Sequence, residues 1–206
     1  MTKPDISQQV KDIKQSFRQM MDGAVAKSMR DKGLAYKVNW GATLPRLREM
    51  AESMGKDYDL AIALWKEDVR ECRILATMLM PADRMLSEVV DIWMEQLSTQ
   101  EVAEQAAFNL WQHLPFAPEK AYQWMASDKE LYQLCGFHVL SRLFMNGQEP
   151  NERGINEYID QLLSALQGPY PAVRKAAYQS VLHFAELGLV YERLAANALR
   201  QIQMTL

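Results

Sequence analysis

One apolar stripe recurs three times along this sequence, always at helical spacing. In each copy three apolar residues follow one another four residues apart, so they share one face of an α-helix. The copies are Val102, Ala106 and Leu110; Leu131, Cys135 and Val139; and Val173, Ala177 and Val181. A looser fourth copy spans residues 69–80. Because the copies begin roughly 30 to 40 residues apart, they predict a solenoid of stacked helix pairs that bury each other's apolar faces.

Helix-breaking residues divide the chain between these stripes. The breaks are expected at Gly33, Thr43 to Pro45, Gly55, Pro81, Pro115 with Pro118, residues 145–154, residues 168–171 and Gly188. No β-branched run alternates with polar residues, which argues against strands. The sequence therefore predicts an all-α fold, an α-α superhelix (HEAT-like repeat solenoid) of about ten helices, with a plain helical bundle as the alternative.

The same breaks predict a single domain over residues 1–206. Residues 1–33 would form an N-terminal helical cap, residues 43–188 the repeats, and residues 189–206 a closing helix. Capping segments of this kind are needed because a terminal repeat has a neighbour on one side only.

Composition limits the partners. The chain is 49% hydrophobic and 24% charged, as in folded globular proteins, and its net charge is -3. Residues 1–103 carry 15 basic and 16 acidic side chains and residues 104–206 carry 8 and 10, so neither half has the positive excess of many nucleic-acid-binding domains. The N-terminus is charged and no apolar run is long enough to span a bilayer. We expect a cytoplasmic protein with no membrane partner.

No cofactor or metal is expected. The histidines, His113, His138 and His183, are 25 and 45 residues apart, each on its own predicted helix. Cys72 and Cys135 lie among apolar residues without CxxC spacing, which favours buried free thiols over a redox pair. The chain also has no Gly-rich phosphate loop, nucleophile elbow or HExxH motif.

Several strings resemble a known family. LPRLREMAESMGKDYDLAIALWKEDVRECRILATMLM, at residues 44–80, is similar to the DNA alkylation repair family of AlkD-like alkylpurine DNA glycosylases, which are HEAT-repeat proteins. VAEQAAFNLW from residue 102, WMASD from Trp124, LCGFHVL from residue 134 and VRKAAYQSVL from residue 173 follow in that family's order. The resemblance covers most of residues 40–190 and implies a groove that binds double-stranded DNA.

The resemblance also identifies four cleft positions, and this chain departs from the family at each of them. Where active members have a tryptophan and an aspartate four residues apart, this sequence has Gln100 and Glu104. Leu134 replaces an arginine, and Gln179 replaces a second tryptophan. The family's aromatic rings contact the cationic lesion nucleotide, and its arginine holds a phosphate. Three of the four substitutions remove those contacts.

Glu104 is the candidate catalytic carboxylate. Loss of an alkylated purine passes through an oxocarbenium-like sugar, which a carboxylate beside it stabilises. Glutamate keeps the charge but is one methylene longer than aspartate, which displaces the carboxylate by about 1 Å. The alternative is that Glu104 is a solvated groove residue without a catalytic role.

Five basic residues are candidates for contacts with the DNA backbone: Lys66, Arg70, Arg73, Arg174 and Lys175. Glu67, Asp68 and Glu71 interleave with the first three, so salt bridges on a solvated helix are an alternative use of those charges.

The residues support two functions. The first is a catalytically inactive binding or scaffold protein with weak DNA binding or with a protein or peptide in its concave groove. The second is an active glycosylase that excises N3- or N7-alkylated purines through Glu104. Whether the protein is an enzyme stays open at this point.

Overall fold

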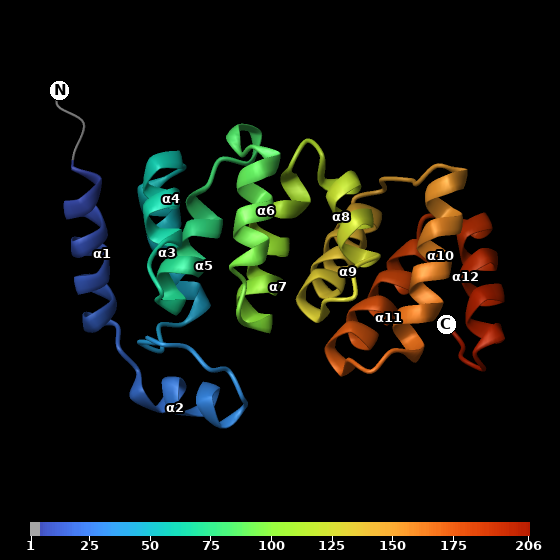
Figure 1. The fold of residues 1–206 in the computed structure, drawn as a ribbon, viewed down its shortest axis with the longest axis horizontal. Coiled ribbons are helices and arrows are strands. Elements are labelled where there is room, and N and C mark those ends of the chain that lie inside the picture. The colour runs from blue at the N-terminus through green and yellow to red at the C-terminus, as the bar shows by residue number, and fades with distance from the viewer. Residues whose placement is uncertain (1–4) are drawn as a thin grey trace. The chain divides into compact units, whose positions relative to one another are not determined.

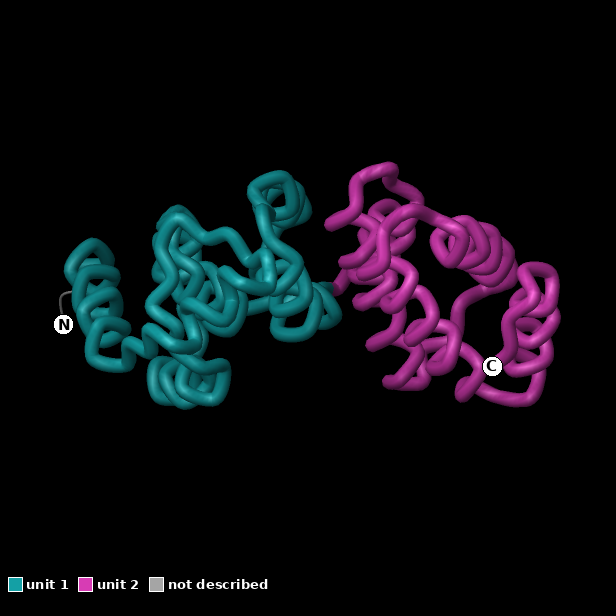
Figure 2. Tube along the Cα trace, turned by 90° about the horizontal axis from the view of Figure 1, so that it is seen from below, with its two compact units in different colours: residues 1–114 teal, residues 115–206 magenta. Residues whose placement is uncertain are grey.

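The computed structural model describes residues 5–206, and it confirms the all-α prediction (Figure 1). Over these residues the chain forms twelve α-helices and two short 3-10 helices. The β-type pairing described there is one isolated bridge between Val38 and Val69. The chain divides into two compact units, residues 1–114 and 115–206, each with its own core (Figure 2). No helix of the described residues is long and apolar enough to cross a membrane.

The first unit contains seven α-helices within residues 5–114. They are α1 (Ile6–Gln19), α2 (Gly23–Asp31), α3 (Leu44–Met54), α4 (Tyr58–Trp65), α5 (Arg70–Leu79), α6 (Ser87–Glu95) and α7 (Gln100–Asn109), with η1 (Ala82–Arg84) and η2 (Trp111–His113). Helix α5 packs against α3, α4 and α7, and α1 packs against α4. Helix α5 is therefore the central helix of this unit, and eight of its residues are buried.

The second unit contains α8 (Ala117–Met125), α9 (Glu130–Met145), α10 (Glu152–Gln167), α11 (Pro171–Ala185) and α12 (Leu189–Gln201). Helix α9 packs against α8 and α11, and α11 packs against α10 and α12. At Gly136 the α8 backbone comes so close that an added Cβ would lie 2.5 Å from the backbone nitrogen of Met125. Glycine is therefore required where α9 crosses α8.

The apolar stripes lie in the cores as the sequence predicts. Eight of their nine residues are at most 1% exposed, and Leu131 is half-buried. Both cysteines are buried free thiols. Burial and the nearby charge of Glu67 raise the pKa of Cys72 to about 12. The repeated stripe therefore reports the buried face of α7, α9 and α11.

The structure has twelve α-helices within residues 5–206, more than the ten or so that the sequence predicts, because some helix boundaries were not recognised. The N-terminal segment ends at Gly33 as expected, but it is divided into α1 and α2 near Asp22. The Asp22 carboxylate accepts hydrogen bonds from the backbone N–H groups of Ala24 and Val25, so it caps α2. Thr99 caps α7 in the same way, because its hydroxyl accepts a hydrogen bond from the backbone N–H of Val102. An aspartate or threonine cap gives a weaker sequence signal than a glycine or proline.

Candidate functional site

Helix α7 brings together two of the four predicted cleft residues. Gln100 and Glu104 lie one helical turn apart and so share a face. The Gln100 side-chain amide donates a hydrogen bond to Glu104 Oε1 at 2.7 Å. Gln100 is exposed and Glu104 is half-buried. The helix face that resembles the family's catalytic face therefore presents an amide that is hydrogen-bonded to a carboxylate.

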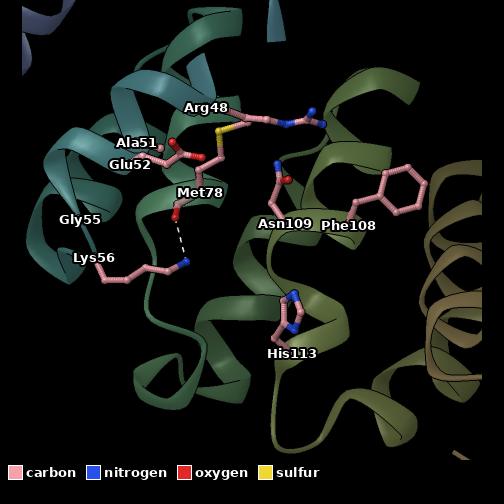
Figure 3. Close-up of a pocket in the computed structure, with 9 residues that line it drawn as sticks. All are labelled: Arg48, Ala51, Glu52, Gly55, Lys56, Met78, Phe108, Asn109 and His113. Atoms are coloured by element: carbon pink, nitrogen blue, oxygen red, sulfur yellow. Dashed lines mark hydrogen bonds between the residues drawn. The ribbon is translucent and has the colours of Figure 1, made fainter. Parts of the chain in front are cut away.

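Figure 3 shows a pocket of the first unit to which the end of α7 contributes. Its volume is about 450 Å³, and it lies between α3, α5, the end of α7 and η2. Phe108, one turn beyond Glu104, lines it. The lining residues are Arg48, Ala51, Glu52, Gly55, Lys56, Met78, Phe108, Asn109 and His113.

Three basic side chains and one carboxylate, Glu52, border this pocket. Lys56 Nζ donates hydrogen bonds to the backbone carbonyls of Met78 at 2.8 Å and Met80 at 3.3 Å. Partial burial lowers the pKa of Lys56. Its charge therefore compensates the carbonyl end of α5. Arg48 and His113 are the other basic side chains of the lining. Such a lining suits a polar ligand with an anionic group beside the apolar surface of Met78 and Phe108.

The other two predicted cleft positions belong to the second unit. Leu134 on α9 is 1% exposed, so it is a core residue of the fold. Gln179 on α11 is exposed, but an amide has no π surface. Neither residue supplies a charge or an aromatic ring to a DNA ligand.

The structure corrects the expectation for Arg70, because its guanidinium is buried and not available to a phosphate. Only 1% of the side chain is exposed. Arg70 Nε and Nη2 donate to the two carboxylate oxygens of Glu101 at 2.7 and 2.6 Å, and Nη1 donates to Ala42 O at 2.8 Å. Nη1 also lies 3.1 Å from Glu71 Oε1. The two hydrogen bonds from Arg70 to the carboxylate of Glu101 are the strong form of an arginine–carboxylate pair.

The carboxylates around Arg70 fix the connection between α2 and α3. Glu71, with no exposed surface, accepts hydrogen bonds from the backbone N–H groups of Trp40, Gly41 and Ala42. Tyr36 donates its phenol proton to Glu101. Burial alone would raise the pKa of Glu101, but the hydrogen bonds and charge of Arg70 outweigh it and lower that pKa. Glu71 and Glu101 are structural residues that sequence reasoning assigned to surface salt bridges or overlooked.

The remaining basic candidates differ in what they contact. Lys66 and Lys175 are exposed. Arg73 donates to Gln96 O at 2.8 Å, lies 3.6 Å from Asp68 and covers Trp65 with its guanidinium. Arg174 donates to Gly168 O at 2.6 Å. Arg73 and Arg174 therefore support the ends of neighbouring elements, and the two lysines are the members of the set most open to solvent.

Sequence reasoning missed a basic segment at the N-terminus. Residues 1–48 carry ten lysines and arginines, four aspartates and no glutamate. Residues 49–103 carry five basic and twelve acidic side chains, so a division of the chain at residue 103 hides the excess. A sliding count of charge would have found it.

The histidines do not form a metal site. His138 is buried, and burial together with the charges of Arg142 and Lys175 lowers its pKa to about 4. His183 Nδ1 lies 2.7 Å from the Ser141 hydroxyl. No three histidine, cysteine, aspartate or glutamate side chains within residues 5–206 are grouped to hold a metal ion.

Comparison with solved structures assigns this helical arrangement to a class. It matches a structure described as "A new family of proteins related to the HEAT-like repeat DNA glycosylases with affinity for branched DNA structures". The TM-score is 0.83 at 15% identity, and the match covers 94% of this chain and 83% of the other. The fold is therefore the HEAT-like repeat fold that the sequence predicts.

The model of one family, described as DNA alkylation repair enzyme, matches residues 13–177. The chain belongs to this DNA alkylation repair family, as the strings of residues 44–80 and beyond indicate. A search of curated proteins gives no match.

Proposed function

We propose that this protein binds duplex DNA as a non-catalytic member of its family, a binding or scaffold protein without glycosylase activity. One observation carries the proposal: the exposed Gln100 amide donates a 2.7 Å hydrogen bond to Glu104, on the helix face where the resemblance implies an aromatic ring beside the catalytic carboxylate. The proposal includes a cytoplasmic location.

The chemistry of base excision explains why this substitution matters. An N-alkylated purine is cationic, and an aromatic face attracts it most strongly where water is excluded. Gln100 supplies no such face. A carboxylate lowers the barrier by stabilising positive charge on the sugar, and this effect depends on a preorganised position. The Gln100 amide donor stabilises negative charge on Glu104 Oε1, which weakens the attraction of that oxygen for a developing cation.

DNA is the proposed partner for two reasons. The family is one of DNA alkylation repair, and the structurally similar protein is described as having affinity for branched DNA. Lys66 and Lys175 are also exposed, so they are open to phosphate oxygens. The alternative is a protein or peptide partner, which would need no contacts between the protein and phosphate groups.

Two measurements on the full chain test the proposal. Fluorescence anisotropy with labelled linear and branched duplexes should show binding that weakens steeply with salt. Release of 7-methylguanine and 3-methyladenine from alkylated duplex DNA should not exceed that in buffer. Salt-independent binding, or none, would refute the DNA partner.

A matched pair of variants tests the second candidate function. Glu104→Ala removes the candidate catalytic carboxylate, and Glu95→Ala removes an exposed glutamate at the end of α6. Base release that Glu104→Ala abolishes and Glu95→Ala retains would identify an active glycosylase for N3- or N7-alkylated purines and overturn the non-catalytic proposal.

A further inference from the structure

We infer that the phosphate backbone of DNA is held by the first unit's N-terminal basic surface, defined here as Lys11, Lys14 and Arg18 of α1 with Arg46 of α3. The inference rests on the proposed DNA-binding function and names the surface that performs it. None of these residues is among the cleft positions that the family resemblance identifies.

The three basic residues of α1 form one row. Lys11, Lys14 and Arg18 are spaced by three and four residues, so their side chains lie along one face of the helix. Val10, Ile13 and Phe17 hold the helix to the unit on the adjoining, buried face. Arg18 lies seven residues after Lys11, so the row rises about 10 Å along the helix at 1.5 Å per residue. One strand of duplex DNA rises about 3.4 Å per phosphate along the duplex axis, so a row laid parallel to that axis matches the rise of about three phosphates.

Two hollows connect this row to Arg46. The first, of about 560 Å³, is lined by Lys11, Lys14, Gln15, Arg18 and Gln19. The second, of about 320 Å³, is lined by Gln19 and Met20 to Asp22 of the α1–α2 connection with Gly41, Thr43 and Arg46. Because Gln19 borders both hollows, they form one continuous surface. The glutamine amides there provide neutral hydrogen-bond donors for phosphate oxygens.

Most of the positive charge of this surface is not neutralised locally. Lys14 forms a 2.7 Å ion pair with Glu67, so it contributes least. The carboxylate of Asp12 accepts from the Gln8 amide, and that of Asp22 caps α2. The other three basic residues of the surface are exposed, and none of them takes part in an ion pair within residues 5–206: Lys11, Arg18 and Arg46.

The buried Arg70 cluster holds part of this surface in place. The Arg18 guanidinium lies over the Trp40 ring, 5.5 Å from its centroid. Glu71 accepts a hydrogen bond from the Trp40 backbone N–H, and Trp40 O accepts one from the Asp22 N–H. Arg18 therefore rests on a ring whose backbone is fixed on both sides, which reduces the entropy lost when it binds a phosphate.

Salt titrations of two charge-matched variants test the inference. Lys11→Gln/Arg18→Gln/Arg46→Gln removes three charges from the N-terminal basic surface. Arg153→Gln/Arg193→Gln/Arg200→Gln removes three exposed charges from the second unit. Each phosphate contact contributes about 0.9 to the slope of log K against log salt, so the first variant should show a slope shallower by about 2.7. The second variant should keep the slope of the unmodified protein, and circular dichroism should show both variants folded.

The outcomes separate this inference from the proposed function. If the unmodified protein binds duplex DNA with a steep salt slope and the first variant keeps that slope, the DNA-binding function stands and the N-terminal basic surface is refuted. If the slope of log K against log salt falls equally in both variants, the effect comes from net charge, and the N-terminal basic surface is refuted as well. If the unmodified protein shows no salt-dependent DNA binding, the proposed function fails first. Tighter binding to phosphatidylserine vesicles than to duplex DNA would assign the surface to a membrane and overturn the inference.

Discussion

Replacement of Arg70 by methionine should destabilise the first unit more than replacement of its partner Glu101 by glutamine. The Arg70 guanidinium is the single positive charge between two carboxylates, those of Glu71 and Glu101. Arg70→Met leaves both carboxylates close together, one of them without exposed surface. Glu101→Gln leaves the Arg70–Glu71 pair intact and removes one charged acceptor.

The magnitudes follow from these contacts. Removal of one partner of a buried ion pair costs about 3 to 5 kcal/mol, because the other charge remains buried. Loss of hydrogen bonds to a charged group costs about 1.5 to 3 kcal/mol. We therefore expect the free energy of unfolding to fall by about 4 kcal/mol in Arg70→Met and by about 2 kcal/mol in Glu101→Gln.

Urea unfolding followed by tryptophan fluorescence measures this difference. Four of the five tryptophans, Trp40, Trp65, Trp93 and Trp111, lie within residues 1–114, so the emission reports mainly on the first unit. Unfolding free energies of Arg70→Met within 0.5 kcal/mol of the unmodified protein, or a larger loss in Glu101→Gln, would refute the ion-pair argument.

Three further predictions follow from the structure. The folded-state pKa of Glu101 lies below its ordinary value of 4.5, so its contribution to the free energy of unfolding is complete above that pH and is lost on acidification. In urea titrations, the stability difference between the unmodified protein and Glu101→Gln should therefore shrink below about pH 4.5. The His138 imidazole should titrate at about 4 by NMR, and because the unfolded chain takes up that proton first, stability should fall as the pH drops from 6.5 to 4. Gly136→Ala should lower the free energy of unfolding of the second unit by at least about 2 kcal/mol, because the added Cβ would meet the α8 backbone. An unchanged midpoint of thermal unfolding would contradict this close approach.

The fold could be predicted because its strongest signals are local and repeated. The stripes at Val102, Cys135 and Val173 each report the buried face of one helix, and Gly33 and Gly188 mark helix ends through backbone conformations with positive φ. The helix ends at Asp22 and Thr99 were missed because a polar cap residue is also common elsewhere on a surface.

The functional residues were harder to predict because their roles depend on contacts between distant parts of the chain. Arg70 stands among charged neighbours like a surface residue, but Glu101, 31 residues later, buries and pairs it. No spacing rule links these positions. The hydrogen bond between Gln100 and Glu104 is local and follows from their spacing of four residues. The resemblance could identify those positions, but the side chains that replace the family's residues show what chemistry is lost.

A single-turnover assay on duplex DNA with one 7-methylguanine tests the central claim most directly. Protein in excess over labelled duplex allows binding to be read by mobility shift and base loss by alkaline cleavage in the same sample. We predict that the duplex is bound and that the abasic product does not exceed that in buffer. Abasic product that forms with the unmodified protein and disappears in Glu104→Ala would contradict the claim that this family member binds DNA without excising a base.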